Sequence, residues 1–370
     1  MPGFVPPPYP YDRLRPLAEV AAVHAGGAVD LSVGTPFDPP PAFVAGPLGD
    51  PDLARAYPPS IGTGRYRDAA RGWLSRRFGV DVAPGGLAAC VGTKELVAGL
   101  PQWLRLRRPE RDTVLYPAVS YPTYAMGATL AGCRAVPVPV DERWRIRLDA
   151  VDPADAERAL CLWVNTPGNP AGALDDLAAA AEWGRRHGVP VLSDECYAEF
   201  TWDGPPRSIL QHGTDGLLAV HSLSKRSNFA GARLGFYAGD EDLVGFLSEV
   251  RKHAGLLPPG PVQAAGALAW DDDRHVEEQR ERYRERLDLA AAVLERLDLA
   301  VPRPEGAFYL WVPAPGGDAW GLAHRLAEAV GAVVSPGEFY GTAGAGHVRV
   351  AVVQPTERLR LLADRVGARP

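Results

Sequence analysis

The sequence predicts an α/β protein whose largest part is a mostly parallel β-sheet lying between helices. Between residues 88 and 240, short apolar runs rich in β-branched residues alternate with Ala-rich helical segments, as in repeated β-α units. These runs are apolar nearly throughout, so we expect a sheet that is covered on both faces. Polar residues directly follow four of the runs, at the edge of the sheet where open α/β proteins bind ligands.

Seven segments are the predicted strands of this sheet. They are residues 88–91 (AACV), 113–117 (TVLYP), 134–140 (RAVPVPV), 159–165 (ALCLWVN), 189–195 (VPVLSDE), 217–223 (LLAVHSL) and 233–239 (RLGFYAG). Residues 174–188 are a predicted helix, because acidic residues occupy the first turn, Arg and His the last, and Gly188 follows. We place the large domain at residues 45–273.

A smaller α+β domain is expected from the two ends of the chain, residues 1–44 and 274–370. A long charged helix is predicted where RHVEEQRERYRERLDLAAAVLERL begins at residue 274, and the strands AFYLWV and HVRVAVV follow it. The chain has 370 residues, of which 46% are hydrophobic and 23% charged. This composition suits a globular protein of about two domains.

Charge and cysteine usage exclude several classes of partner. The net charge of -6 gives no electrostatic reason to expect nucleic acid or an anionic membrane. No apolar run is long enough for a membrane span or for the core of a signal peptide. The four cysteines (Cys90, Cys133, Cys161 and Cys196) form no metal-binding spacing. We therefore expect a cytoplasmic protein without a bound metal.

Lys225, in the run HSLSKRSNFAGARLGF, is one of only three lysines in the chain. It closes a predicted strand, where a desolvated lysine can lose its proton and form a Schiff base with a carbonyl cofactor. Arginine cannot take this role because it stays protonated. From the two letters SK alone, a surface lysine at a strand end is the simpler interpretation.

Asp194 ends another predicted strand, where an acid is costly to bury unless a cation pairs with it. A protonated pyridine nitrogen would be such a cation, and holding it protonated is what makes pyridoxal 5'-phosphate an electron sink. A helix cap or an arginine partner would explain Asp194 as well. Gly92 and Thr93 begin a helical run, so their amides could receive a phosphate, with Ser222, Ser224 and Arg233 as further donors.

Taken in order, these residues resemble the class I/II aminotransferases, which are fold-type-I pyridoxal-phosphate enzymes. The run SLSKRSNFAGARLG matches the family's lysine signature, S-x-S-K followed after seven residues by Arg and then x-G. The likeness extends from DLSVGTPFDPP at residue 30 to GHVRVAVV at residue 346. The resemblance implies the fold-type-I architecture and pyridoxal 5'-phosphate as cofactor.

Carried over by position, the resemblance implies a role for each residue around the cofactor ring. Lys225 would bind the cofactor covalently and move a proton between it and the substrate α carbon. Asp194 would hold the pyridine nitrogen, and Tyr197 and Asn169 would bond the phenolic oxygen. Tyr121 would stack on the ring. Its run PAVSYPTY departs from the usual P-x-Y-P, because more residues separate the first proline from the tyrosine.

The resemblance also implies a phosphate site, a substrate site and a homodimer. The phosphate would be held by the amides of Thr93 and Lys94, by Ser222 and Ser224, and by Arg233. Tyr57 would reach the phosphate from a second subunit. Gly34, Asn169 and Arg349 would bind the substrate, with Arg349 as a bidentate fork on its α-carboxylate. Lys94 is a departure, since many relatives have a small residue there.

Four segments narrow the resemblance to one branch of the family. VGTKELVAGLP, YPTYAMGATLAG, WVNTPGNPAG and RKHAGLLPPGPVQAA are similar to actinobacterial N-succinyldiaminopimelate aminotransferases. The implied reaction exchanges an amino group between glutamate and N-succinyl-2-amino-6-oxopimelate. That substrate has carboxylates at both ends, so Arg251 and Lys252, with His253 beside them, are candidates for the distal carboxylate. An exposed basic helix end would explain this cluster equally well.

Other functions remain open within and outside this family. The same pocket could transaminate aspartate, aromatic amino acids or kynurenine, or run β-elimination as a carbon-sulfur lyase. The S-x-x-K pattern at Ser222 also occurs in penicillin-recognising hydrolases, but no K-T-G element follows it. GTGRYR lacks the third glycine of a dinucleotide fingerprint. The leader before DLSVG is short, so we do not expect the helix-turn-helix domain of an aminotransferase-like transcription regulator.

Overall fold

The computed structural model describes residues 4–367, and the chain divides into two units. Thr35–Glu281 and Pro304–Ala307 form the larger unit, and the smaller unit contains the chain up to Gly34, Arg282–Arg303 and the chain from Phe308 onward. The sequence suggested these transitions at residues 44/45 and 273/274. In the structure the charged run that begins at residue 274 is the start of helix α11 (Arg274–Glu295). The first turns of α11 belong to the larger unit.

A seven-stranded sheet with the order β2-β8-β7-β6-β5-β3-β4 forms the centre of the larger unit. Strands β7, β6, β5, β3 and β4 are parallel to one another, whereas β8 is antiparallel to both β7 and β2. The predicted mostly parallel sheet is therefore confirmed. The strands are β2 (Leu87–Cys90), β3 (Thr113–Pro117), β4 (Arg134–Val138), β5 (Ala159–Asn165), β6 (Val191–Asp194), β7 (Leu217–Ser222) and β8 (Gly235–Gly239).

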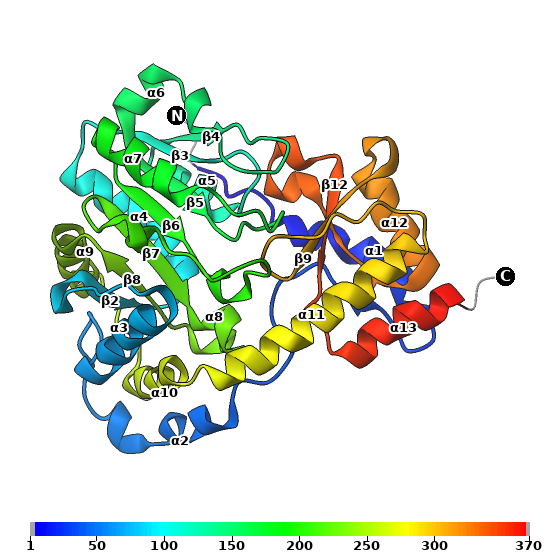
Figure 1. The fold of residues 1–370 in the computed structure, drawn as a ribbon, viewed down its shortest axis with the longest axis horizontal. Helices are drawn as coiled ribbons and strands as arrows, with labels where there is room; N and C mark the ends of the chain where they lie inside the picture. Colours follow the sequence, from blue (N-terminus) through cyan, green and yellow to red (C-terminus); the bar gives the residue numbers. More distant parts are fainter. Residues whose placement is uncertain (1–3, 368–370) are drawn as a thin grey trace. The chain divides into compact units, whose positions relative to one another are not determined.

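Helices cover both faces of this sheet (Figure 1). One face packs against α4 (Thr93–Arg107), α5 (Thr123–Leu130) and α9 (Glu241–His253). The other face packs against α3 (Gly64–Phe78), α7 (Leu177–His187) and α10 (Gly260–Asp271). Because both faces are covered, the central strands are buried along their whole length, which explains their nearly continuous apolar sequences. This unit also contains the first turns of α11 and three short helices, α2 (Ala45–Leu48), α6 (Pro153–Arg158) and α8 (Leu223–Arg226).

Local capping signals fix the ends of the helices next to the sheet. Asp176 accepts a hydrogen bond from the Ala179 amide at the start of α7, and Gly188 ends this helix with a φ of 59°. The helix predicted at residues 174–188 is thereby confirmed. Helix α4 begins after Gly92, whose φ of 75° lies in the left-handed region that favours glycine.

The smaller unit combines a three-stranded antiparallel sheet with helices from both ends of the chain. The sheet has the order β11-β12-β9, from β9 (Tyr309–Pro313), β11 (Ser335–Pro336) and β12 (His347–Ala351), and the pair β1 (Val29–Asp30) and β10 (Ala332–Val333) is parallel. Its helices are α1 (Arg15–Ala22), α12 (Ala319–Val330), α13 (Thr356–Gly367) and the second part of α11. The two strands predicted in this region are confirmed as β9 and β12.

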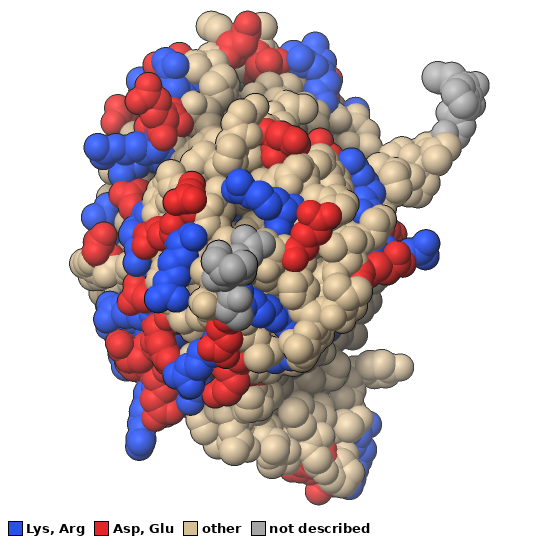
Figure 2. Space-filling model, turned by 90° about the vertical axis from the view of Figure 1, so that its right-hand side faces the viewer, with Lys and Arg blue, Asp and Glu red and all other residues tan. Residues whose placement is uncertain are grey.

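The charged side chains are mixed in sign on the face drawn in Figure 2, where lysines and arginines lie among aspartates and glutamates. This face carries no broad patch of a single sign. Within residues 4–367, no helix has both the length and the apolar character needed to cross a membrane.

Candidate functional site

The carboxyl ends of four strands meet at one edge of the large sheet. Strands β5, β6 and β7 are parallel neighbours, and β2 runs in the same direction because both β2 and β7 are antiparallel to β8. These strands end at Cys90, Asn165, Asp194 and Ser222. The fold therefore gathers at one edge the polar segments that the sequence singled out after each strand.

Asp194 is a buried carboxylate at the end of β6. Its side chain accepts a hydrogen bond from the Tyr124 hydroxyl at 2.9 Å and one from the Cys196 amide at 3.2 Å. Burial raises the pKa of Asp194, and the hydrogen bonds from Cys196 and Tyr124 and the nearby His221 oppose that rise. A cation placed beside this carboxylate would be strongly stabilised by it.

The loop after β5 is tied to Asp194 through two asparagines. The Asn165 side-chain amide donates to the Asp194 carbonyl at 2.9 Å, and its oxygen accepts from the Asn169 amide at 2.8 Å. Asn169 is itself buried and precedes a cis proline. Tyr197 is buried three residues beyond Asp194, and Tyr121 lies edge-on to Tyr124 with ring centroids 5.9 Å apart. All four predicted ring contacts thus lie on elements that leave this edge of the sheet.

The start of α4 and Arg233 together form a small cup for an anion. A Cβ added to Gly92 would lie 2.4 Å from the Arg233 guanidinium, so only glycine allows the two to approach this closely. Thr93 is the first residue of α4, where free backbone amides point outward. Arg233 has a φ of 55°, and Ser222 caps α8 by accepting from the Ser224 amide at 3.0 Å. Amide, hydroxyl and guanidinium donors therefore converge in a pattern suited to a phosphate.

Lys225 lies on α8, the four-residue helix that follows β7. Its charge lies close enough to Cys196 to oppose the rise in the pKa of that thiol, a rise caused mainly by burial and then by Asp194. The same thiol donates to the Thr93 hydroxyl at 3.4 Å. Cys196 therefore connects the surroundings of Lys225, Asp194 and the anion cup.

A second polar centre lies within the smaller unit around Arg349 on β12. Arg349 is 2% exposed, donates to the Ser32 carbonyl at 2.5 Å, and lies over the rings of Tyr309 and Tyr340 at 4.3 and 4.7 Å. A Cβ on Gly34 would lie 2.2 Å from the Tyr309 hydroxyl, so this position has room for no side chain. The aromatic rings hold the planar guanidinium in an orientation suited to a carboxylate.

Three of the remaining predicted residues, Arg251, Lys252 and Tyr57, lie outside these two centres. Arg251 is 1% exposed and makes a bidentate ion pair with Glu95 at 2.7 and 3.0 Å, so its guanidinium is already occupied within the chain. Lys252 is on the surface and pairs with Glu249 at 2.8 Å. Tyr57 is 94% exposed. Lys94 is the second residue of α4, so its backbone belongs to the anion cup, whereas the residue as a whole is exposed.

Two residues that the sequence did not suggest contribute directly to this architecture. Tyr124 holds Asp194, and its position three residues after Tyr121 in SYPTY is the only local signal for it. Glu95 neutralises Arg251, a partner 156 residues away that no local pattern indicates. The part of the chain that the structure describes contains no group of His, Cys, Asp and Glu side chains suited to a metal ion.

Known proteins of similar sequence match the chain over nearly its whole length. The sequence profile described as "Aminotransferase class I and II" matches residues 27–366. The chain belongs to the class I and II aminotransferase family. One relative, the 4-dedimethylamino-4-oxo-anhydrotetracycline transaminase OxyQ of Streptomyces rimosus, is 41% identical over 97% of this chain and 99% of its own length. The LL-diaminopimelate aminotransferase of Aquifex aeolicus is 33% identical over 97% of this chain and 96% of its own length.

Solved structures place the aminotransferase in the fold-type-I class. A probable N-succinyldiaminopimelate aminotransferase from Thermus thermophilus superposes with a TM-score of 0.87 at 29% identity, over 97% of this chain and 99% of that one. The family uses pyridoxal 5'-phosphate, which is therefore the cofactor of this aminotransferase. Amino acids and 2-oxo acids are the substrates of the family.

The residues at the sheet edge fit the two charged ends of this cofactor. The cup formed by Gly92, Thr93 and Arg233 offers donors to a phosphate dianion. The buried Asp194 carboxylate, whose pKa is raised by burial, would be stabilised by a pyridinium cation. A phosphate at one end and a carboxylate-binding cation at the other are both features of pyridoxal 5'-phosphate.

Proposed function

We propose that this aminotransferase exchanges an amino group between glutamate and N-succinyl-2-amino-6-oxopimelate, forming 2-oxoglutarate and N-succinyl-LL-2,6-diaminopimelate. Such a reaction would serve the synthesis of diaminopimelate and lysine, and would correspond to enzyme class 2.6.1.17. The observation that carries the proposal is the likeness over nearly both whole chains to the Thermus protein. The relative from Aquifex is named for LL-diaminopimelate, which has the same carbon skeleton without the succinyl group. Its similarity therefore supports a substrate with this skeleton.

Lys225 and Asp194 would have the central chemical roles. Bound pyridoxal 5'-phosphate supplies an electron sink while its pyridine nitrogen is protonated. Asp194, held by Tyr124, would keep the proton on that nitrogen. Lys225 would hold the cofactor covalently between turnovers and then move the proton at the substrate α carbon. Tyr197 and Asn169 would orient the ring oxygen, and Tyr121 would pack on the ring face.

The phosphate would be held by Thr93, the Lys94 amide, Ser222, Ser224 and Arg233. The α-carboxylate of the substrate would bind to Arg349, with Asn169 and the backbone beside Gly34. The bidentate fork of Arg349 suits this planar group better than a lysine could. Both candidates from this segment for the distal carboxylate are paired, Arg251 with Glu95 and Lys252 with Glu249. The pair of Lys252 is exposed and therefore weak, so Lys252 could exchange its partner for the substrate more easily.

A homodimer completes the proposal. Tyr57 is 94% exposed, and the stretch of chain before it also exposes Phe43, Leu48 and Leu53. A second copy of the chain would cover these apolar side chains and bring Tyr57 to the partner's phosphate.

Mixing two inactive variants, Lys225→Ala and Tyr57→Ala, tests this arrangement. If Tyr57 acts across the interface, about a quarter of the sites in the mixture become intact. If Tyr57 acts within its own chain, activity stays absent.

A second candidate function is the amination of a ketone on a polycyclic ring. The specific observation that favours it is the 41% identity with OxyQ over nearly both whole chains. Aspartate, aromatic amino acids, kynurenine and β-elimination of cystathionine are the remaining alternatives for the same site.

A side-by-side comparison of kcat/KM tests these alternatives. N-succinyl-LL-diaminopimelate, LL-diaminopimelate, aspartate, kynurenine and phenylalanine are supplied as amino donors to 2-oxoglutarate. The ring ketone named in OxyQ is supplied as acceptor from glutamate, and pyruvate release from cystathionine is followed separately. We expect the succinylated donor to exceed the others by at least about tenfold. A larger value for any other substrate would reject the proposed one while leaving the aminotransferase chemistry intact.

A further inference from the structure

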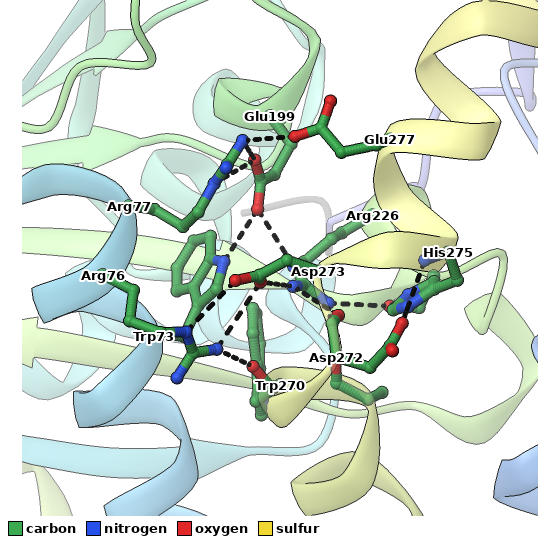
Figure 3. Close-up of polar contacts among 12 residues, drawn as sticks. Trp73, Arg76, Arg77, Glu199, Arg226, Trp270, Asp272, Asp273, His275 and Glu277 are labelled. Atoms are coloured by element: carbon green, nitrogen blue, oxygen red, sulfur yellow. Dashed lines mark hydrogen bonds and ion pairs between the residues drawn. The ribbon is translucent and has the colours of Figure 1, made fainter.

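The three residues that follow Lys225 are each hydrogen-bonded to helix α11 or to the residue just before it. The Arg226 guanidinium donates to Asp273 at 2.9 Å, the Ser227 hydroxyl lies 2.9 Å from His275 Nε2, and the Asn228 side-chain amide donates to Gln279 at 3.2 Å. All of these residues belong to the larger unit. Figure 3 shows Arg226 at the centre of the resulting cluster, with its contacts to Glu199 and Asp273 drawn as dashed lines.

Arg226 is buried, and its guanidinium donates hydrogen bonds to two carboxylates and two backbone carbonyls. It is 2% exposed, pairs with Glu199 at 3.2 Å, and donates to the carbonyls of Ala269 and Asp272 at 2.6 and 3.1 Å. Its guanidinium also lies 5.1 Å from the ring of Trp270. Burial lowers the pKa of Arg226, and the charges of Glu199 and Asp273 oppose that change. The side chain is therefore fixed in position by several directional contacts.

Helix α8 depends on such outside contacts for its geometry. It has only four residues, Leu223–Arg226, and a single helical turn is not stable by itself. Beyond it, Asn228 has a φ of 53°, in the left-handed region that ends the helix and that asparagine adopts more readily than most residues with a side chain. The direction in which α8 presents Lys225 must therefore be imposed by the neighbouring helices.

Glu199 extends the cluster to helix α3. Its carboxylate accepts from Trp73 Nε1 at 2.7 Å and from Arg77 at 3.0 Å, in addition to Arg226. Arg76 on the same helix pairs with Asp273 at 3.1 Å and donates to the Trp270 carbonyl at 2.7 Å. Arg226 is thus the one guanidinium of these three that belongs to the segment carrying Lys225.

We propose that Arg226 is a positioning residue for Lys225, acting through its pairs with Glu199 and Asp273. These two ion pairs, called the clamp below, hold α8 against α3, α10 and the start of α11. They thereby fix where the Lys225 amine lies. The inference rests on the proposed role of Lys225. A misplacement of about 1 Å at a reacting group can lower a rate by about a hundredfold, so a loosened clamp should affect turnover more than substrate binding.

The test uses Arg226→Gln, Arg226→Lys and the control Arg76→Gln. Arg76→Gln removes a guanidinium from the same cluster and leaves the segment after Lys225 bonded. The first measurement needs no cofactor: the apoprotein is labelled with an acylating reagent over a range of pH, and modification of each lysine is followed by peptide mass spectrometry. Lys252, on the surface, is the internal standard. The second measurement is kcat and KM of the holoenzyme.

Arg226→Gln should change the labelling rate or pH midpoint of Lys225 relative to Lys252, and should lower kcat by about tenfold to a hundredfold with little change in KM. Arg226→Lys should recover part of both effects, and Arg76→Gln should leave both near wild type. Wild-type labelling and kcat in a folded Arg226→Gln protein would overturn the proposal, as would equal effects from Arg76→Gln.

Two milder variants keep the test decisive if Arg226→Gln does not fold. Asp273→Asn weakens one partner of Arg226, and Asn228→Ala removes the bond to Gln279. At least one should shift the labelling of Lys225 in the same direction, and wild-type behaviour of both would overturn the clamp. Lys225→Ala separates the two hypotheses, because borohydride-trapped cofactor on that variant would reject the role of Lys225 and leave the labelling result unaffected.

Discussion

The hydroxyl of Tyr124 donates a 2.9 Å hydrogen bond to Oδ2 of Asp194, and both side chains are buried. Tyr124 is in turn stacked on Trp163, with ring centroids 5.1 Å apart and an interplanar angle of 22°. The tyrosine is therefore held by packing from one side and oriented toward the carboxylate on the other. Its pKa is raised well above the ordinary value, mainly by burial and then by the charge of Asp194, so it remains a donor.

Replacing Tyr124 with Phe should weaken cofactor binding by about tenfold to a hundredfold, because loss of a hydrogen bond to a buried charged group costs about 1.5–3 kcal/mol. Without this donor the pKa of Asp194, already raised by burial, should rise further. The defect should therefore grow as the pH falls and Asp194 takes up a proton. Cofactor affinity measured by absorbance across pH tests this, with Tyr116→Phe on β3 as control. Unchanged affinity at low pH would contradict it.

The sequence predicted those features of the site that depend on residue type at the end of a strand. Lys225, Asp194 and Thr93 could be selected because each follows an apolar run, and the sheet gathers such ends at one edge. Their roles at the cofactor remain predictions. The strands themselves were predictable because burial on both faces demands apolar residues at every position.

The contacts that hold these residues could not be predicted in the same way. Tyr124 and Asp194 are 70 residues apart, and Arg226 and Asp273 are 47 apart. Such pairs depend on how helices pack over the sheet, which no local pattern encodes. Arg251 shows the consequence, because the sequence marked it as a cation available to substrate and the fold places Glu95 against it.

Replacing Glu95 with Gln should destabilise the protein by about 3 kcal/mol, because it leaves the buried Arg251 guanidinium without its charge partner. The double variant Glu95→Gln with Arg251→Met should recover most of this loss, since no unpaired charge then remains. Urea unfolding of both proteins measures the difference. Should Arg251→Met in the double variant raise KM for the succinylated donor alone, Arg251 would be a substrate residue after all.

Asp175 should make the stability depend on pH in the direction opposite to that of most carboxylates. Burial raises its pKa to about 7, against the hydrogen bond that its Oδ1 accepts from the Ile146 amide at 2.9 Å. Between about pH 4 and 7 the folded protein binds this proton and the unfolded chain does not. This contribution to stability is therefore present at low pH and lost as the pH rises toward 7.

Asp175→Asn should consequently gain stability relative to wild type as the pH is raised from 5 to 8, by at most about 3 kcal/mol. Urea unfolding at the two pH values measures the difference. Asp176→Asn is the matched control, because Asp176 is exposed at the start of α7 and asparagine caps a helix equally well. A constant difference between Asp175→Asn and wild type across this range would show that Asp175 ionises normally.

Replacing Arg349 with Lys should raise KM for amino acid substrates by at least about tenfold with a smaller change in kcat. Lysine keeps the charge but loses the planar fork that binds a carboxylate through two parallel hydrogen bonds, and it packs less well over Tyr309 and Tyr340. Initial rates with a substrate and with the matching amine that lacks the α-carboxylate separate binding from chemistry. The amine should react at similar low rates with both proteins, because it makes no use of the fork. If Arg349→Lys slowed the amine as much as the amino acid, the residue would act on the structure of the smaller unit rather than on the carboxylate.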